Sequence, residues 1–373
     1  MKRLALISGF VLFSTCCFAS VDQNLPFVWH VRVDGDDSYE GHSYQTGLAT
    51  INAAVAASAD GDTIYIWPGD YNETVDLDTH NKALTLIGIS RSASRITHAN
   101  NAAGIKLENG CVIKNLSVIL TGPPGNGSST QAVVGASKRN CTIEDCDIKG
   151  TYDGLYMGDA VKPIIKNCRI SAGFDALYLA GATDFLVDNC TIEVSNSYST
   201  ETPMRALIFF NNSRGVCRNL CISVDRKDAG VASARTAGIE FFGGISMMVV
   251  VENFTINVTA GANVAGDVYG VYSSQMGRLT GGKITLSNGI ISAVTSGSGK
   301  SRGIYNLNSA GTIAVQNVIY SDTSGAVTQG GSGWGEAVSH YADPNDYLSK
   351  ITKYLIILSG YNKMPSTVPT IGN

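Results

Sequence analysis

The sequence is short of charged residues, of histidine and of proline. Only 16% of its 373 residues are charged, the net charge is −4, and lysine and arginine form no run. Nucleic-acid-binding domains normally carry a basic patch, so a nucleic-acid partner is not expected. Nine prolines are too few for a proline-rich, low-complexity chain. The five histidines are scattered, which indicates neither a histidine-based triad nor a metal site, and we expect no bound cofactor.

Long apolar runs are also missing. The apolar stretch 4–13 is shorter than the roughly 20 residues that a membrane-spanning helix needs. Lys2 and Arg3 precede this stretch, and a small-residue cleavage site ends at Ala19, which is typical of a signal peptide. We therefore expect cleavage after Ala19, no membrane span, and a secreted or periplasmic protein.

The cysteines do not suggest a disulfide framework. Cys16 and Cys17 lie in the expected signal peptide, where attachment of a lipid to either stays open. The other seven are Cys111, Cys141, Cys146, Cys168, Cys190, Cys217 and Cys221. An odd number leaves at least one of them without an intramolecular disulfide partner. We interpret most of them as buried packing residues.

Two segments in the middle of the chain nearly repeat each other. Residues 153–157 and 165–170 (DGLYM and IKNCRI) recur 22 positions later as 175–179 and 187–192 (DALYL and VDNCTI). A fixed period of this size indicates a solenoid, in which each repeat buries its apolar face only against its neighbours. Because the repeats are short β-prone runs broken by glycine and asparagine, the sequence predicts an all-β, single-stranded parallel β-helix.

Aligning the repeats from residue 104 onward gives columns with a constant character. One column holds Asn115, Asp145, Asn167, Asn189, Asn219, Asn253, Asn288 and Asn317. Aliphatic residues dominate two positions before and three positions after this column, which marks both flanks as core. Asparagine tolerates left-handed backbone, so this column predicts a turn whose side chains are buried and stacked. The preceding column alternates in charge sign over six coils, which predicts an exposed face.

The beginning of the chain resembles a known family. The run Thr50-Ile51, Ala53-Ala54, Gly61 to Ile66 and Pro68 to Tyr71 is similar to the N-terminal part of pectin-lyase-like right-handed β-helix proteins. The resemblance continues through the coils to about residue 320 and implies a right-handed helix. It is specific for the fold and common to many activities.

Helices are expected at both ends of the solenoid. Residues 50–57 predict a helix with one apolar face, and residues 344–358 predict another. Solenoid ends need such caps to stay soluble. We therefore divide the chain into a signal peptide (1–19), an N-terminal cap with the first coils (20–103), the β-helix proper (104–320) and a C-terminal cap (321–373).

A line of polar residues crosses the repeats on a second column. Each coil contains a strand of the form x-small-aliphatic-x, and its lead residue is Gln131, Asp153, Asp175 or Arg205 in four successive coils. These side chains should form one rung per coil on the surface. Only four residues lead to each aspartate, whereas twelve lead to Gln131 and twelve to Arg205. Short loops between longer ones predict a notch with the two carboxyl groups open to solvent on its floor.

The chemistry of this notch suits a polysaccharide. Tyr156 and Tyr178 lie three positions after the aspartates and should stand side by side, where rings can contact sugar faces. Two carboxyl groups about 4.8 Å apart should titrate as a coupled pair and share a proton. Arg205 would moderate their repulsion or hold an anionic substrate. Gln131 could donate a hydrogen bond to a developing oxyanion.

This constellation resembles the active site of pectin methylesterases. That family carries Gln-Ala-Val, then Gln-Asp-Thr-Leu-Tyr, then Val-Asp-Phe-Ile-Phe-Gly. Here QAV at 131–133, YDGLY at 152–156 and FDALY at 174–178 fall at comparable spacing. The resemblance implies a carbohydrate esterase that acts on an acidic polysaccharide.

Carried over residue by residue, the resemblance makes Asp175 the nucleophile, Asp153 the acid and base, and Gln131 an oxyanion donor. The chain departs from the family at two points. Tyr152 stands where the family has a second glutamine and is counted with the substrate-binding tyrosines. The family's Leu-Gly-Arg-Pro-Trp motif is absent, so Arg205 is a substitute in position only.

Three other interpretations stay open at this point. Asp153 and Asp175 could cap turns through their side chains, as aspartates at coil corners commonly do. The protein could be a non-catalytic β-helix that binds glycan or serves as a surface structure. It could also be a calcium-dependent polysaccharide lyase, with the two aspartates as ligands and Arg205 as base, although such a site usually has more carboxylates.

Overall fold

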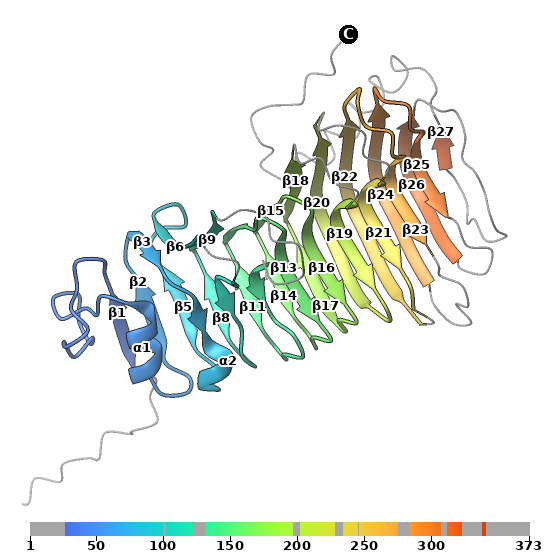
Figure 1. The fold of residues 1–373 in the computed structure, drawn as a ribbon. Helices are drawn as coiled ribbons and strands as arrows, with labels where there is room; N and C mark the ends of the chain where they lie inside the picture. Colours follow the sequence, from blue (N-terminus) through green and yellow to red (C-terminus); the bar gives the residue numbers. More distant parts are fainter. Residues whose placement is uncertain are drawn as a thin grey trace, which may run out of the picture.

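The computed structural model describes residues 27–99, 102–121, 131–196, 202–227, 234–244, 246–274, 283–306, 312–322 and 338–340. The expected signal peptide and the expected C-terminal helix at 344–358 lie outside these residues. Within them, the chain forms an elongated stack of parallel strands with two short helices at its N-terminal end (Figure 1). The all-β solenoid predicted from the sequence is confirmed.

Three ladders of parallel strands run along the stack. The first contains β1 (Val28–Val31), β2 (Thr63–Ile66), β5 (Thr85–Gly88), β8 (Val112–Lys114), β11 (Thr142–Glu144), β14 (Ile164–Lys166) and β17 (Phe185–Asp188). The second contains β3 (Gly69–Asn72), β6 (Ser94–His98), β9 (Ser117–Leu120), β12 (Asp147–Lys149), β15 (Arg169–Ala172) and β18 (Thr191–Asn196). The two ladders merge in the longer strands β20 (Arg214–Arg226), β22 (Met248–Ala260), β24 (Lys283–Thr295) and β26 (Thr312–Asp322), followed by β27 (Val338–His340).

The third ladder is a separate nine-stranded sheet and carries the polar line. It contains β4 (Val75–Asp76), β7 (Ile105–Lys106), β10 (Gln131–Val134), β13 (Asp153–Gly158), β16 (Asp175–Ala180), β19 (Met204–Phe210), β21 (Thr236–Phe242), β23 (Val268–Ser274) and β25 (Ser301–Asn306). Each coil therefore contributes one strand to this sheet, and residues at one column position become neighbours across it.

The N-terminal helix is present where the sequence predicted it. Helix α1 (Ile51–Ala57) begins after Thr50, whose side chain accepts a hydrogen bond from the Ala53 N–H. The Glu73 carboxylate accepts two more of the first backbone N–H groups, which a helix start leaves without intrahelical partners. The helix buries Ile51, Ala54 and Val55. Its role as a cap stays a prediction. The second helix, α2 (Leu77–His80), is a single turn.

The outer edge of β1 is covered by the segment that follows it. His30 N–H donates to the carbonyl of Gly41, and Leu48 N–H donates to the carbonyl of His30. Arg32 N–H donates to the carbonyl of Leu48. Because an open strand edge is a template for pairing with another chain, this segment protects the first coil.

The asparagine column forms the turn between the first two ladders. All eight residues of the column have left-handed backbone, with φ between 52° and 56°. The side chains stack as predicted, since Asn189 Nδ2 donates to Asn167 Oδ1 at 2.9 Å. The prediction that they are buried is wrong, because Asn167 is half-buried and Asn189 is exposed. A left-handed turn residue at a coil corner points its side chain outward, where water and the neighbouring amide satisfy it.

The cysteines pack in the interior as expected. Cys146, Cys168 and Cys190 lie directly behind the asparagine column and are each at most 2% exposed. All seven cysteines outside the expected signal peptide are free thiols, and six of them are buried. Small apolar residues of this kind fill the narrow space inside a turn without needing a disulfide.

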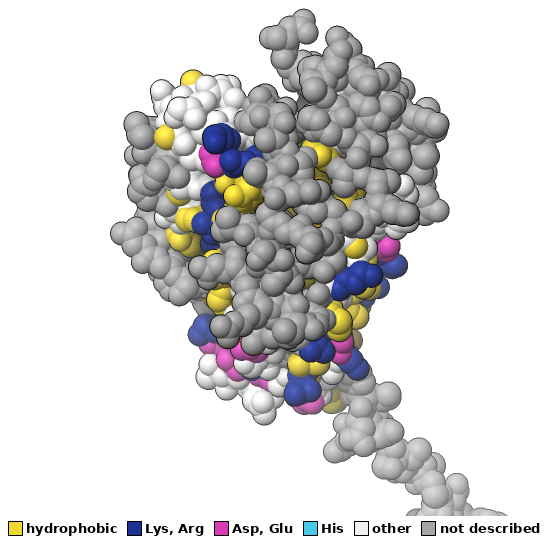
Figure 2. Space-filling model, turned by 90° about the vertical axis from the view of Figure 1, so that its right-hand side faces the viewer, with side chains coloured by type: hydrophobic (Ala, Val, Ile, Leu, Met, Phe, Trp, Pro, Cys, Tyr) yellow, Lys and Arg dark blue, Asp and Glu magenta, His cyan; other side chains and the backbone are white. Residues whose placement is uncertain are grey.

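Charged side chains on the surface connect neighbouring coils. Lys114 Nζ lies 2.8 Å from Glu144 Oε2, and Arg218 Nη2 lies 2.9 Å from Asp188 Oδ2. The predicted alternation of charge along this column therefore produces ion pairs between coils. Dark blue and magenta side chains also lie next to each other on the described part of the face shown in Figure 2.

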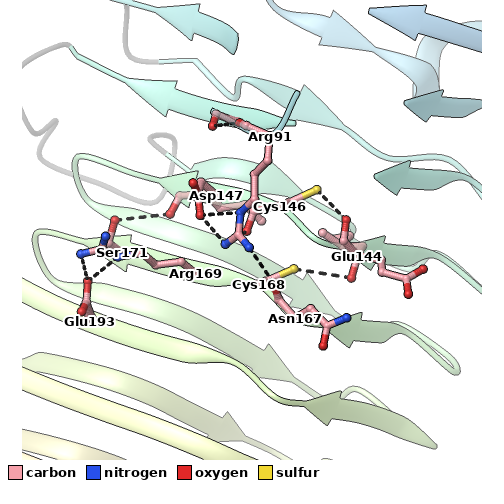
Figure 3. Close-up of polar contacts among 12 residues, drawn as sticks. Arg91, Glu144, Cys146, Asp147, Asn167, Cys168, Arg169, Ser171 and Glu193 are labelled. Carbon is pink, nitrogen blue, oxygen red and sulfur yellow. Dashed lines mark hydrogen bonds and ion pairs between the residues drawn. The ribbon is translucent and has the colours of Figure 1, made fainter. Parts of the chain in front are cut away.

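Arg91 connects coils that are not adjacent. Its guanidinium donates to Asp147, to the carbonyl of Cys146 at 3.1 Å and to the carbonyl of Asn167 at 3.2 Å (Figure 3). Asp147 is 56 residues away along the chain. One long side chain thus fastens three coils at the turn column, where strand pairing is interrupted.

Neither helix in the described part of the chain is long and apolar enough to cross a membrane. 

Because Ile170 belongs to the core and Lys166 to the charged column, replacing each by alanine should lower stability by different amounts. Ile170 is fully buried, so Ile170→Ala should lower the free energy of unfolding by about 2–5 kcal/mol. Lys166 is half-buried in the charged column, and Lys166→Ala should cost about 0–1 kcal/mol. Urea denaturation of both variants measures the difference. Equal losses would contradict the core and surface assignment.

Candidate functional site

The register of the nine-stranded sheet brings the predicted site residues together. Gln131 pairs with Asp153, Asp153 with Asp175, and Asp175 with Arg205. The predicted row of four rungs is therefore confirmed, but its predicted place on the surface is wrong, because Gln131, Asp153 and Asp175 are buried. It exists because the coils between these residues keep every strand in step, so that chain positions 22 to 30 residues apart become direct neighbours.

The four side chains bond to one another in two pairs. Gln131 Nε2 donates to Asp153 Oδ2 at 3.1 Å. Arg205 donates from Nε to Asp175 Oδ1 at 2.8 Å and from Nη2 to Asp175 Oδ2 at 2.7 Å. This bidentate contact is among the strongest geometries available to a carboxylate in a protein. Asp175 therefore has a cation at both oxygens, whereas Asp153 has only a neutral amide.

The predicted exposure of the two carboxyl groups is wrong. Asp153 is 4% exposed and Asp175 is 2% exposed, so neither lies open to solvent. Loop lengths predicted room between the coils but gave no information on how side chains fill it. Here the Gln131 amide and the Arg205 guanidinium lie directly against the carboxyl groups. Much of the two longer loops predicted as walls of the notch lies outside the described residues.

The interpretation of the aspartates as turn caps is also wrong. A capping aspartate accepts hydrogen bonds from nearby backbone N–H groups. The side-chain bonds of Asp153 and Asp175 go instead to Gln131 and Arg205, on the neighbouring coils. Asp153 Oδ1 is buried without any hydrogen-bond partner. An arrangement of this kind serves no local backbone need.

The environments of the two carboxyl groups differ. Burial, together with the charge of Asp175, raises the pKa of Asp153 to about 7. Burial also raises the pKa of Asp175, but the Arg205 guanidinium acts against that rise. A pair that shares one proton keeps the negative charge where the cation is. We infer that Asp153 carries the proton and that Asp175 is ionised.

Sequence analysis missed two residues that extend this network. Glu240 is fully buried, and Arg235 donates to it from Nε at 3.2 Å and from Nη2 at 2.5 Å. Arg205 Nη1 lies 3.8 Å from Glu240 Oε2 and so connects Glu240 to the Asp175 ion pair. Glu240 stands in the same column as Tyr178, and a charged residue in that aromatic column was an available signal. Arg235 lies outside the repeat, so no periodicity marked it.

An aromatic strip runs beside the polar line. The rings of Tyr156 and Tyr178 are 5.4 Å apart and perpendicular, as expected for neighbours in one column. The strip continues through Phe210, 6.2 Å from Tyr178, to Phe242, 5.2 Å further on. Sequence analysis did not identify the two phenylalanines. All four side chains are half-buried, which leaves ring surface for a ligand.

Tyr152 occupies a different place from the two tyrosines of the strip. Its ring centroid lies 4.7 Å from that of Phe174, and its side chain packs against the core. Its backbone carbonyl accepts the N–H of Asp175, which positions the strand that carries this aspartate. The carboxylates of Asp175 and Asp153 are near enough to its hydroxyl to raise its pKa, after the larger effect of burial.

The raised pKa of Asp153 predicts a pH-dependent stability. An unfolded aspartate has a pKa of about 3.9, so between pH 4 and pH 7 the folded state binds more protons than the unfolded state. Folding stability from this group is therefore present at low pH and lost as pH rises to about 7. Asp153→Asn cannot ionise, so its stability relative to the parent should rise by about 1 kcal/mol per pH unit across this range.

Urea denaturation at several pH values measures this difference. Asp145→Asn, which removes a carboxylate from the asparagine column, controls for the general effect of losing one negative charge. Parallel stability curves for Asp153→Asn and the parent would show that Asp153 is ionised throughout.

The ion pair between Arg205 and Asp175 predicts that removing only the cation costs more stability than removing both charges. Arg205→Met leaves Asp175 buried without a cation and should lower stability by about 3–5 kcal/mol. Adding Asp175→Asn to this variant removes the buried charge and should recover part of the loss. A double-mutant cycle of the two substitutions measures their coupling. Additive effects would mean that the two side chains do not depend on each other.

Comparison with known proteins confirms the type of fold. The family model described as "Right handed beta helix region" matches residues 125–319. Among curated proteins, no sequence matches the chain.

Several solved structures are similar to this chain at low sequence identity. Pectin methylesterase PemA from Erwinia chrysanthemi is 14% identical, with a TM-score of 0.45, over 67% of this chain and 90% of that one. Pectin methylesterase from carrot is 13% identical, with a TM-score of 0.43, over 91% and 97%. The catalytic domain of a GH87 alpha-1,3-glucanase is 12% identical, with a TM-score of 0.44, over 78% and 67%. The family match covers more than half of the chain, which therefore belongs to the right-handed parallel β-helix family.

Proposed function

We propose that the chain is an exported β-helix protein that binds and processes an acidic polysaccharide as a carbohydrate esterase. The observation that carries this proposal is the Asp153–Asp175 pair. Burial raises the pKa of Asp153 to about 7, and Arg205 donates to both oxygens of Asp175, which favours the ionised form of that carboxyl group. Environments that separate the roles of two adjacent carboxyl groups are typical of an acid and a nucleophile.

In the proposed reaction, Asp175 attacks the carbonyl carbon of a sugar ester and forms an acyl intermediate. Asp153 gives its proton to the departing alcohol, which leaves Asp153 as a carboxylate. Water then attacks the intermediate, Asp153 takes a proton from it, and the free acid leaves with Asp175 restored. A group with a pKa near neutral can both donate and accept this proton at physiological pH. The reaction needs no cofactor.

The other residues of the line assist this chemistry. Gln131, which already contacts Asp153, would donate a hydrogen bond to the oxyanion of the tetrahedral intermediate. Arg205 keeps Asp175 ionised and oriented. Tyr156 and Tyr178 would contact the sugar rings, and burial raises the pKa of Tyr178 to about 12, so its hydroxyl keeps its proton as a hydrogen-bond donor.

A second candidate function is non-catalytic binding of a glycan. The observation that favours it is the low exposure of both carboxyl groups, which restricts access by a polymer. In this case the aromatic strip would bind the glycan, and the polar line would only hold the coils together.

The third interpretation, a calcium-dependent lyase, has less support. It requires Arg205 to act as a base and hence to lose its proton. Burial works to lower the pKa of Arg205, but the Asp175 carboxylate raises it above its usual value. An arginine in a bidentate ion pair is a poor base, and its two donors already hold the proposed calcium ligand Asp175.

Release of methanol from methyl-esterified pectin tests the esterase proposal. Asp175→Asn should abolish release, because an amide keeps the shape of the side chain but cannot act as nucleophile. Asp153→Asn should slow release by about 10²–10⁴-fold, the usual range for a general acid. Thermal unfolding of both variants shows that the fold is intact, and parallel assays on unmethylated pectin with and without calcium detect lyase activity.

The outcomes separate the candidates. Methanol release that depends on Asp175 supports the esterase. Binding to pectin without any release, combined with aspartate variants that change only stability, would leave the glycan-binding protein.

A further inference from the structure

A cavity opens on the same sheet, beyond the carboxyl pair. Its volume is about 440 Å³, within the range of 300–1,000 Å³ that is typical of sites for small molecules. Arg235, Asp267, Tyr269 and Tyr272 contribute its polar and aromatic walls. None of these residues belongs to the proposed esterase centre.

The cavity lies in line with the carboxyl pair. Asp175 pairs with Arg205, Arg205 pairs with Ala237, and Ala237 pairs with Tyr269. Tyr269 is therefore three rungs from Asp175 in the same column, a separation of about 14 Å at the usual spacing of strands. A polymer that follows the axis of the solenoid across this sheet would reach both places.

The acidic group of the cavity is already satisfied within the protein. Asp267 Oδ1 accepts the backbone N–H of Lys300 at 2.8 Å. Asp267 Oδ2 accepts Arg302 Nη1 at 2.8 Å and the hydroxyl of Tyr269 at 3.0 Å. Three donors, one of them a cation, hold this carboxylate, so it repels an anionic ligand less than a free carboxylate would.

The remaining polar groups of the cavity are donors. Arg235 uses Nε and Nη2 to bind Glu240, and its guanidinium lies 5.1 Å from the centre of the Tyr272 ring. This geometry holds the guanidinium in place while Nη1 takes no part in the contact with Glu240. The Tyr272 hydroxyl enters no hydrogen bond within the described residues. Two fixed donors, one of them cationic, suit a ligand with acceptor oxygens.

We propose that this cavity is a second sugar-binding site, which takes the carboxylate of a uronic acid residue through Arg235 and Tyr272. The proposal rests on the proposed function in one respect, namely that the ligand is an acidic polysaccharide. It adds a position three rungs from the reacting ester, where an unesterified residue of the same polymer is held. Binding there would favour partly de-esterified chains over fully esterified ones.

The cavity is also connected to the carboxyl pair. Arg235 and Arg205 share Glu240, and Arg205 in turn holds Asp175. A carboxylate bound at Nη1 shares the positive charge of Arg235 with Glu240, so the attraction between Arg235 and Glu240 weakens without any movement of the guanidinium. Glu240 then attracts Arg205 more strongly, which couples occupation of the cavity to the environment of the nucleophile.

Isothermal titration of the mature protein with an unesterified oligogalacturonate tests the proposal. Tyr272→Phe removes one hydroxyl and should weaken binding about tenfold, the cost of losing a hydrogen bond to a charged group. Tyr305→Phe is the matched control, because Tyr305 stacks on Tyr272 at 5.9 Å but does not line the cavity. It should bind like the parent. Arg235→Met should reduce affinity more than Tyr272→Phe does.

Two further ligands identify the chemistry. A neutral oligosaccharide of equal length should bind at least about tenfold more weakly, because it lacks the charged acceptor. Inorganic sulfate should bind weakly or not at all. Sulfate that binds as tightly as the oligogalacturonate would reduce the cavity to a simple anion site and overturn the proposal.

Failure of this proposal is distinguishable from failure of the esterase. Asp175→Asn should still bind the oligogalacturonate at the cavity even though it cannot release methanol. A protein without esterase activity whose binding depends on Tyr272 and not on Tyr305 retains the second site. No binding by the parent, or equal affinities for Tyr272→Phe, Tyr305→Phe and the parent, overturns the proposal. Because Tyr272→Phe leaves every ion pair intact, it decides the question even if Arg235→Met fails to fold.

Discussion

The alignment of parallel strands from coil to coil is the constraint on which the rest of this structure depends. Each coil repeats at a separation of about 4.8 Å, and the left-handed asparagine column makes every coil turn at the same point. If one coil slipped by a single residue, its core side chains would face solvent. Arg91 connects its own coil to two others across the turn column, which adds resistance to such a slip.

The same spacing creates the electrostatic character of the nine-stranded sheet. Stacking places like residues together, so two aspartates in one column become neighbours whether or not their charges repel. The charged column, which directly precedes the asparagine column, avoids repulsion between neighbouring coils by alternating the sign of its charges. In the polar line, Arg205 compensates the charge of Asp175, and the pKa of Asp153 rises to about 7, which favours its neutral form below that pH. A buried oxygen without a hydrogen-bond partner is costly, so Asp153 Oδ1 argues for a role of this residue beyond folding.

The network around Arg205 connects the two proposed sites through the interior of the protein. The network consists of four residues of alternating charge: Asp175, Arg205, Glu240 and Arg235. The two carboxylates are buried and the two arginines are half-buried. Burial strengthens each interaction, because water does not screen charges inside the protein as it does at the surface. A change at one end of such a chain alters the partners of the next residue, which is the physical basis for coupling the cavity to the carboxyl pair.

The sequence by itself determined the solenoid, the turn column, the core columns and the order of the polar line, because each is a property of a repeat whose period can be read along the chain. It also placed Gln131, Asp153, Asp175 and Arg205 in one row. Only the tertiary structure decided that the two carboxyl groups are buried, that Arg205 binds Asp175 and not Asp153, and that Glu240 and Arg235 extend the network. Burial and bonding depend on how side chains of different lengths fill the space between coils. Arg235 and Asp267 lie in connecting segments outside the repeat, so no periodicity could reveal the cavity that they line together with Tyr269 and Tyr272 of β23.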